Sequence, residues 1–352
     1  MTAVPIVIGH RGAAGYVPEH TLDSYFLAMQ FGADFVEPDL VMSRDGVLIA
    51  RHENEIGGTT DVAARPQFAA RRTRRSIDGT QVEGWFTEDF TLAELKTLRA
   101  RERIPTVRPA NTRWDGRFEI PTFEEVLALV QGVEGQRAAR ARQLGLPPPA
   151  RIGVYPETKH PSYFAALRLA MEEPLLATLE RYGYRDAAAP IWLQSFEVGN
   201  LKALARLTTL RRVQLIEASG APYDWVAAHD PRTYAHLLTP QGLADIAQYA
   251  QAIGPAKSLV IPRRADATLG EPTRLVADAH AQGLALHPWT FRAENEFLPG
   301  DLRHGTAASG CGDLQGEILR FLQAGIDGFF TDQADVGVAA RDAFLGGAAP
   351  RS

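Results

Sequence analysis

Five residues among the first 52 have side chains whose types and spacing suit chemistry: the histidines His10 and His52, the arginine Arg11, and the acids Glu37 and Asp39. An imidazole gains and loses a proton near neutral pH, so the two histidines are candidates for an acid and base pair. Glu37 and Asp39 belong to an otherwise apolar run, where carboxylates are rarely buried without a partner. This cluster therefore indicates proton transfer beside a bound cation.

A later segment adds a third acid and a second basic residue, Glu157 and Lys159. Three carboxylates in one cavity repel one another, and a divalent cation relieves that repulsion better than ion pairs with nearby basic residues. We therefore expect Glu37, Asp39 and Glu157 to bind a metal ion. Oxygen ligands alone favour a hard cation, Ca²⁺ or Mg²⁺, and Mn²⁺ would also fit.

Together these residues suit the hydrolysis of a phosphate diester. That reaction needs positive charge around the phosphate oxygens, a proton acceptor for the nucleophile and a proton donor for the leaving alcohol. The metal, Arg11 and Lys159 would supply the charge. His10 and His52, on opposite sides of the phosphorus atom, would supply the two proton transfers.

Each residue also has a structural explanation when it is taken alone. His10 is equally explained as a strand-end histidine bonded to the backbone, and His52 as a surface residue of a hairpin. Gln194 and Trp289 stand at the ends of two further apolar runs and are candidates for substrate contacts, although core packing explains Trp289 equally well. The recurrence of such residues at strand ends favours a functional site.

The elements that must position these residues alternate regularly along the chain. Apolar runs and helical patterns predict eight strands and eight helices, which favours a (β/α)8 TIM barrel over an open doubly wound sheet. We expect residues 1–352 to form a single TIM-barrel domain of the α/β class, with an insertion after the second strand at about 55–121. The carboxyl ends of barrel strands meet at one mouth, where the candidate residues would converge.

The apolar and helical periods give the expected bounds. The strands are expected at 4–8, 33–42, 152–155, 191–195, 213–216, somewhere in 252–261, 285–289 and 328–331. The helices are expected at 22–29, 123–130, 162–182, 201–207, 243–253, 273–282, 317–324 and 336–344, with one more near 92–98 in the insertion and a polar loop at 131–149.

A hairpin is expected to return His52 to the two acids. If Asp45 and Gly46 are the two turn residues, Asp39 lies opposite His52 on the neighbouring strand. Glu37, two residues before Asp39, would then share a face with both. A shift of one residue in the register would place His52 on the other face.

The composition limits the classes of partner. The chain has 352 residues, 45% of them hydrophobic, and a net charge of -5, so no nucleic-acid partner is indicated. The basic run at 71–75 is interpreted as a solvated loop. No run of 18 apolar residues occurs, so we expect no membrane span, and the single Cys311 excludes a disulfide within the chain.

In its motifs the chain resembles the glycerophosphodiester phosphodiesterases. The similarity runs nearly from end to end, including the insertion, and rests on His10-Arg11-Gly12, Pro18-Glu19-His20-Thr21, Glu37-Pro38-Asp39, Arg51-His52-Glu53, Tyr155-Pro156-Glu157-Thr158-Lys159, Gln194-Ser195-Phe196-Glu197 and the segments 287–295 and 327–332. The resemblance implies that the metal ligands are Glu37, Asp39 and Glu157, the acid–base pair His10 and His52, and the phosphate-binding residues Arg11 and Lys159. Members hydrolyse glycerophosphodiesters, such as glycerophosphocholine and glycerophosphoethanolamine, to sn-glycerol 3-phosphate and an alcohol.

The long insertion resembles a bacterial class that is usually exported and uses Ca²⁺, which implies a periplasmic or secreted protein. The N-terminal sequence shows no signal peptide, which favours the cytoplasm if Met1 is the native start. One position departs from the family, which usually has asparagine where this chain has His20. Loop support or a substrate contact could change there, because the two side chains hydrogen-bond with different reach.

Two alternatives to this activity remain. One is a phospholipase D-like barrel acting on sphingomyelin or lysophospholipid, which would need an exposed apolar rim, whereas the insertion is polar and rich in arginine. The other is a non-catalytic binder of glycerophosphodiesters. Either histidine can be the acid, and the nucleophile is water or a neighbouring hydroxyl of the substrate.

Overall fold

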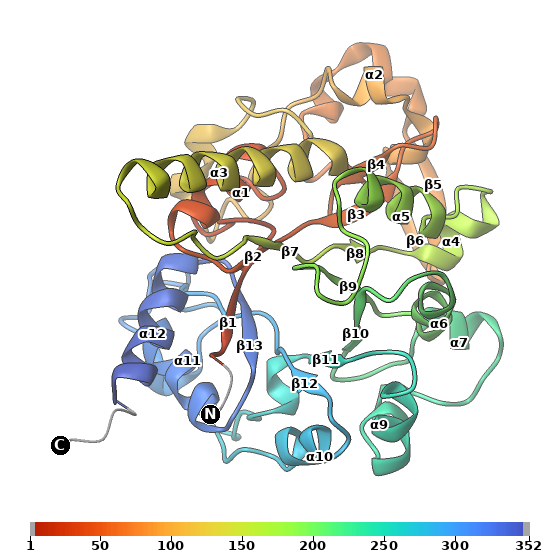
Figure 1. Cartoon of the computed structure of the whole chain (residues 1–352). Coiled ribbons are helices and arrows are strands. Elements are labelled where there is room, and N and C mark those ends of the chain that lie inside the picture. Colours follow the sequence, from red (N-terminus) through yellow and green to blue (C-terminus); the bar gives the residue numbers. More distant parts are fainter. Residues whose placement is uncertain (1–3, 348–352) are drawn as a thin grey trace.

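The first strand, β1 (Ile6–His10), lies parallel between the last strand, β13 (Gly328–Thr331), and β2 (Phe35–Glu37). In this computed structural model, which describes residues 4–347, the parallel pairing continues through β7 (Gly153–Val154), β8 (Glu157–Thr158), β9 (Trp192–Ser195), β10 (Arg211–Ile216), β11 (Ala252–Pro255) and β12 (Ala285–Leu286). A bridge between Phe291 and Thr331 closes the ring. The expected TIM barrel is confirmed (Figure 1).

Two prolines interrupt the strands that carry the acids. Pro38 separates β2 from β3 (Asp39–Met42), and Pro156 lies between β7 and β8. Proline has no N–H to donate, so the ladder cannot run through it. The pairing resumes with Asp39 beside Glu157 on the next strand, which places two of the three acids next to each other.

Helices surround the barrel (Figure 1). Their bounds are α1 (Leu22–Gln30), α3 (Phe123–Gln143), α4 (Pro161–Ala166), α5 (Glu172–Arg181), α6 (Val198–Leu207), α7 (Tyr223–Ala227), α8 (Tyr234–Leu237), α9 (Pro240–Ile246), α10 (Leu275–Ala281), α11 (Leu314–Gln323) and α12 (Ala334–Gly347). A large apolar core packs them against the strands, and a smaller cluster that includes Ile8, Tyr155, Val213 and Phe330 forms a separate core. No helix within residues 4–347 is both long and apolar enough to cross a membrane.

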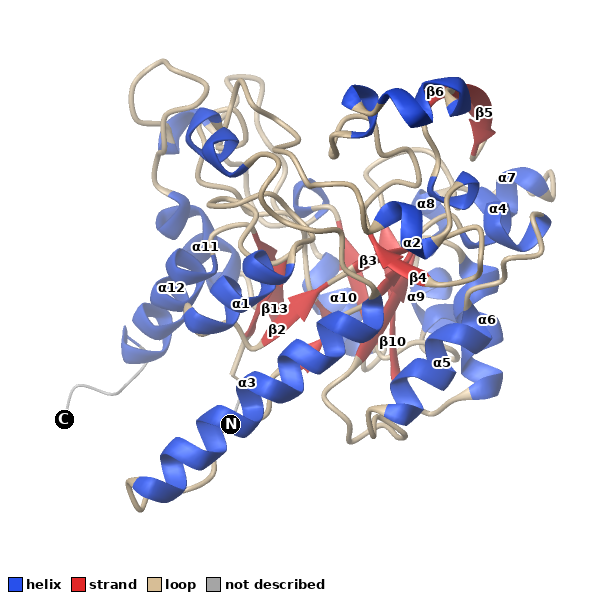
Figure 2. Ribbon diagram, turned by 90° about the horizontal axis from the view of Figure 1, so that it is seen from above, coloured by secondary structure: helices blue, strands red, loops and turns tan. Residues whose placement is uncertain are grey.

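Residues 55–121 contain short elements that do not belong to the barrel ladder. They are the 3₁₀ turns η1 (Val62–Ala64), η2 (Pro66–Arg71), η3 (Thr87–Asp89) and η4 (Pro109–Trp114), the hairpin β5 (Thr73–Ile77) and β6 (Thr80–Gly84), and the short helix α2 (Leu92–Leu95). Figure 2 shows the β5–β6 hairpin beyond one end of the barrel. The basic run is therefore not a loop, because Arg71 ends η2 and Arg74 and Arg75 lie in β5, with Arg72 between the two elements. All four arginines pair with acids of the same segment.

Several expected helix bounds are wrong for identifiable reasons. The helix expected to stop at 130 continues to Gln143, because the polar residues after it are good helix formers. The helix expected over 162–182 is two helices, since Arg168 has a φ of 62° and Pro174 fits only the first turn of the second helix. Residues 252–255 form a strand rather than the end of a helix, and α9 stops at Ile246.

The expected hairpin register is also wrong by one residue. Between β3 and β4 (Leu48–Ala50), Leu40 pairs with Ala50 and Met42 pairs with Leu48. The pair of Met42 and Leu48 is the one next to the turn. The loop has three residues, 44–46, and Gly46 adopts a positive φ of 79° there. Asp39 consequently lies opposite Arg51, whose backbone N–H donates to the Asp39 carbonyl over 3.0 Å.

Candidate functional site

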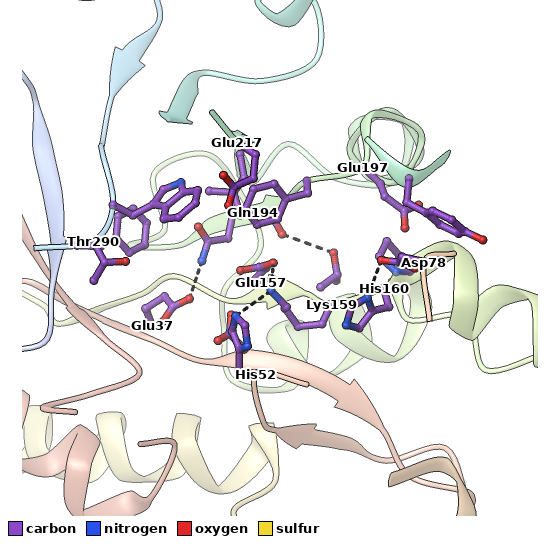
Figure 3. Close-up of a pocket in the computed structure, with 18 of the residues that line it drawn as sticks. Glu37, His52, Asp78, Glu157, Lys159, His160, Gln194, Glu197, Glu217 and Thr290 are labelled. Atoms are coloured by element: carbon purple, nitrogen blue, oxygen red, sulfur yellow. Dashed lines mark hydrogen bonds and ion pairs between the residues drawn. The ribbon is translucent and has the colours of Figure 1, made fainter. Parts of the chain in front are cut away.

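One cavity of about 440 Å³ is lined by all nine residues that the sequence singles out: His10, Arg11, Glu37, Asp39, His52, Glu157, Lys159, Gln194 and Trp289. Figure 3 shows Glu37, His52, Glu157 and Lys159 turned toward one another, with the side chain of Gln194 reaching Glu37. His52 reaches this cavity although the register is different from the expected one. It lies beyond the end of β4, where the alternation of strand faces no longer applies.

The three acids form a group that can hold a divalent cation. Oxygen atoms of Glu37, Asp39 and Glu157 all lie within 4.8 Å of one another, and all three residues are buried. Burial and the other two acids raise the pKa of Glu37 well above its usual range, and burial raises the pKa of Glu157 to about 8. Oδ1 of Asp39 is buried and has no hydrogen-bond partner among residues 4–347. A cation fits this set because it would relieve the repulsion and bind the free oxygen.

Two of the three acids also form ion pairs with basic residues, as expected if the acids bound no metal. Nζ of Lys159 lies 2.8 Å from Glu157, and Nε of Arg11 lies 3.3 Å from Asp39. Within the described part of the chain Glu37 forms no ion pair; it accepts from the Arg11 backbone N–H at 2.8 Å and from Nε2 of Gln194 at 2.9 Å. Gln194 therefore orients an acid of the triad as well as lining the cavity.

His10 is held by an acid from the far end of the chain. Its Nδ1 lies 2.6 Å from Oδ1 of Asp332, and both side chains are buried. Although burial would raise it, Arg108 and Arg292 hold the pKa of Asp332 well below its usual range, so the carboxylate is ionised and Nδ1 donates. Burial and Arg11 lower the pKa of His10 to about 4, which leaves the ring neutral at pH 7.

His52 is held in the same way by its neighbour. Its Nδ1 lies 2.5 Å from Oε1 of Glu53, and its Nε2 lies 3.3 Å from Nζ of Lys159. Burial, with Arg11 and Lys159, lowers the pKa of His52. Neither Glu53 nor Asp332 is among the residues expected from the sequence to act in the site, although the position of Asp332 directly after the barrel strand β13 is a signal for such a role.

His20 contacts an acid of the triad and does not line the cavity. It is fully buried, with Nε2 at 2.9 Å from Oδ2 of Asp39 and Nδ1 at 2.6 Å from the hydroxyl of Tyr25. Its backbone has a φ of 52°, and its carbonyl accepts from the guanidinium of Arg51. The residue therefore supports the loop and Asp39, the first of the two roles considered from the sequence.

The outer part of the cavity combines aromatic rings with acids. Phe196, Tyr223 and Tyr234 line it together with Glu197 and Glu217. Trp289 also lines the cavity. Its Nε1 donates to the Gly254 carbonyl at 2.8 Å, and its ring packs edge to face with Phe196, with 5.8 Å between the ring centroids. Trp289 therefore both lines the cavity and packs against the smaller apolar core, so a substrate contact and core packing are compatible for this residue.

Comparisons with known proteins agree with one another. The sequence model of the Glycerophosphoryl diester phosphodiesterase family matches residues 10–336. A glycerophosphodiester phosphodiesterase of Arabidopsis thaliana is 33% identical over 94% of this chain and 84% of its own length, and one from Haemophilus influenzae is 28% identical over 96% and 90%. Among solved structures, a putative glycerophosphoryl diester phosphodiesterase from Silicibacter pomeroyi has a TM-score of 0.64 at 24% identity, covering 97% of this chain and 94% of that one. A phosphodiesterase of Oleispira antarctica, solved in complex with the product sn-glycerol-3-phosphate, has a TM-score of 0.59 at 19% identity over 96% and 97%.

Proposed function

The chain belongs to the glycerophosphoryl diester phosphodiesterase family, and from this premise we propose that it hydrolyses glycerophosphodiesters to sn-glycerol 3-phosphate and an alcohol. The observation that carries the proposal is the meeting of three kinds of group in one cavity: a buried carboxylate triad, two basic side chains, and two histidines that are each held by a carboxylate. Every group that cleavage of a phosphodiester requires is then within one site.

The phosphate binds between Arg11 and Lys159, with the metal held by Glu37, Asp39 and Glu157. Ca²⁺ is the ion that we assign, with Mg²⁺ as the next choice, because Ca²⁺ accepts several carboxylate ligands in flexible geometry, whereas Mg²⁺ is usually bound by only one or two. When bound, the cation neutralises negative charge on the phosphate oxygens. Arg11 and Lys159, at the ends of β1 and β8 on either side of β2 and β3, orient the phosphate by donating hydrogen bonds.

His10 and His52 move the protons. Each ring donates from Nδ1 to an ionised carboxylate, so Nε2 is the atom that can accept a proton from the nucleophile or return one to the leaving alcohol. Both pKa values are lowered in the protein alone, and the negative charge of a bound phosphodiester would raise them again. One ring acts neutral as the base and the other protonated as the acid.

The outer part of the cavity supports a positively charged alcohol, as in glycerophosphocholine or glycerophosphoethanolamine. Aromatic faces attract quaternary and primary ammonium groups, and Glu217 adds negative charge there. Glu197 adds less, because burial raises its pKa to about 7. Glu217 is exposed and is paired with no basic side chain among residues 4–347. A neutral alcohol would gain less from these groups.

Lipid substrates fit this surface less well. Of the large hydrophobic side chains that are exposed in residues 4–347, only Val226 lines the cavity, so the apolar rim that a sphingomyelin or lysophospholipid needs is absent from this region. A non-catalytic binder would have no use for two histidines that are each oriented by a carboxylate.

The test is release of sn-glycerol 3-phosphate from glycerophosphocholine by the purified protein. We expect release with Ca²⁺, loss of release after chelation, and recovery when Ca²⁺ is returned. Choline release, the product common to both esters, should be at least about 10-fold slower from lysophosphatidylcholine than from glycerophosphocholine, since no apolar rim holds its chain. Activity that survives complete chelation would remove the metal from the mechanism, and tight binding without turnover in saturating Ca²⁺ would favour the binder.

A further inference from the structure

A short segment of the insertion, residues 103–108, reaches the carboxylates behind both histidines. Nη1 and Nη2 of Arg103 donate to the two oxygens of Glu53 at 2.8 and 2.7 Å. Glu53 in turn accepts from Nδ1 of His52 at 2.5 Å. Arg103 also donates to Glu19 from Nε at 2.8 Å, and Glu19 accepts from the guanidinium of Arg11 at 3.0 Å.

The second arginine of the segment repeats this arrangement on the other histidine. Nη2 of Arg108 donates to Oδ2 of Asp332 at 2.6 Å, while Oδ1 of the same carboxylate accepts from Nδ1 of His10. Nε of Arg108 donates to Glu294 at 2.5 Å, and Nη1 donates to the Ala14 carbonyl at 2.8 Å, so the guanidinium is held on three sides.

Hydrogen bonds within the segment hold the two arginines at a set separation. The backbone N–H of Arg108 donates to the Ile104 carbonyl at 2.8 Å, which closes a turn that also contains Pro105. Glu102 accepts from the Ile104 N–H at 2.9 Å and from the amide of Asn111 at 2.9 Å, which joins the two ends of the turn.

We propose that Arg103 and Arg108 are positioning residues that orient His52 and His10 through Glu53 and Asp332. The proposal rests on the proposed roles of the two histidines. A guanidinium that donates to a carboxylate fixes the orientation of that carboxylate, and the oxygen that accepts from Nδ1 fixes the tautomer and the ring orientation of the histidine. The insertion thereby controls both proton-transfer groups from one segment without touching substrate.

A purely structural role is the competing explanation, because buried ion pairs also occur where they only hold loops together. Arg101 offers a matched control within the same stretch. It is half exposed, lies 3.7 Å from Asp115, and has no contact with either histidine's carboxylate. Its replacement removes an arginine from the insertion and leaves the two histidines as they are.

The experiment compares Arg103→Gln, Arg108→Gln and Arg101→Gln in the full-length protein with Ca²⁺. Two substrates are used, glycerophosphocholine and the p-nitrophenyl ester of glycerol 3-phosphate, because p-nitrophenolate leaves without needing a proton. We expect kcat on glycerophosphocholine to fall about 10- to 100-fold for Arg103→Gln and Arg108→Gln, a part of what an acid or base contributes. KM and the Ca²⁺ affinity measured by calorimetry should stay within about twofold, and Arg101→Gln should match the wild type.

The p-nitrophenyl ester separates positioning from general weakening. The variant that disturbs the general acid should lose much less activity on this ester, whereas the variant that disturbs the base should lose the same factor on both substrates. The proposal is overturned if neither variant falls below Arg101→Gln, if Ca²⁺ affinity falls in step with kcat, or if both variants lose equal factors on both esters. Wild-type protein that cleaves neither ester would instead overturn the proposed function.

Arg108 is buried between Glu294 and Asp332, so its replacement leaves two buried acids without their partner and can prevent folding. If Arg108→Gln yields no folded protein, Arg108→Lys keeps the positive charge but cannot donate to both acids at once, and a smaller fall in kcat is expected. The side chain of Arg103 is 27% exposed, so its replacement is milder and decides the proposal for His52 by the same criteria.

Discussion

Nε2 of His20 lies 2.9 Å from Oδ2 of Asp39, so a histidine without access to the cavity holds one of the three acids that we assign to the metal. We expect His20→Ala to weaken Ca²⁺ binding about 10- to 100-fold, as the loss of such an outer partner does in other metal sites. His20→Asn should keep most of the affinity, because an amide can also donate to the carboxylate. Calorimetric titration with Ca²⁺ checks both variants, and equal affinity in His20→Ala and wild type would contradict the role.

Removal of one acid from the triad tests the metal assignment itself. Glu37→Gln should abolish measurable Ca²⁺ binding and lower kcat at least about 100-fold, because a neutral amide cannot replace the carboxylate in a site of three charges. Glu217→Gln is a control in the same cavity and should keep the Ca²⁺ affinity of the wild type. Binding of Ca²⁺ that is unchanged in Glu37→Gln would place the ion elsewhere.

The outer acids should select the charge of the alcohol. Glu217→Gln is expected to lower kcat/KM for glycerophosphocholine about 3- to 10-fold, the effect of one partly solvated charge pair, and to leave glycerophosphoglycerol unchanged. Because Glu217 is exposed, the effect on glycerophosphocholine should shrink as salt is added. The measurement is the ratio of kcat/KM for the two substrates in both proteins, and an unchanged ratio would show that the cavity does not read this charge.

The barrel and the residues of the inner site could be predicted because both depend on local patterns. Short apolar runs end in His10, in Glu37 and in Gln194, and the carboxyl ends of parallel strands must meet. The hairpin was predicted with the wrong turn, although the expected position of His52 near the acids agrees with the structure. The turn has three residues instead of two, yet His52 still reaches the cavity because it lies beyond the end of the strand.

The pairing of His10 with its carboxylate could not be predicted, because nothing local connects the two residues. Asp332 lies 322 residues from His10, and Arg108 comes from a segment without regular structure. Ion pairs over such separations depend on how loops fold back over the barrel, and hydrophobic periodicity carries no information about that. Glu53, next to His52 in the chain, was the one partner within reach of the sequence.

Acid should destabilise the protein through its buried histidines, and His287 allows this to be measured away from the triad. Burial lowers its pKa to about 4, and its Nδ1 accepts from the Tyr155 hydroxyl at 2.8 Å. In the unfolded chain His287 is protonated below about pH 6.5, whereas in the folded protein it stays neutral down to about pH 4. The free energy of unfolding therefore falls as the pH drops from about 6.5 toward 4. His287→Gln should remove about 2 kcal/mol of the difference in unfolding free energy between pH 7 and pH 5, measured by urea unfolding in chelator. Tyr155→Phe, which keeps the histidine, should retain most of that difference, and an equal pH dependence in wild type and His287→Gln would contradict the assignment.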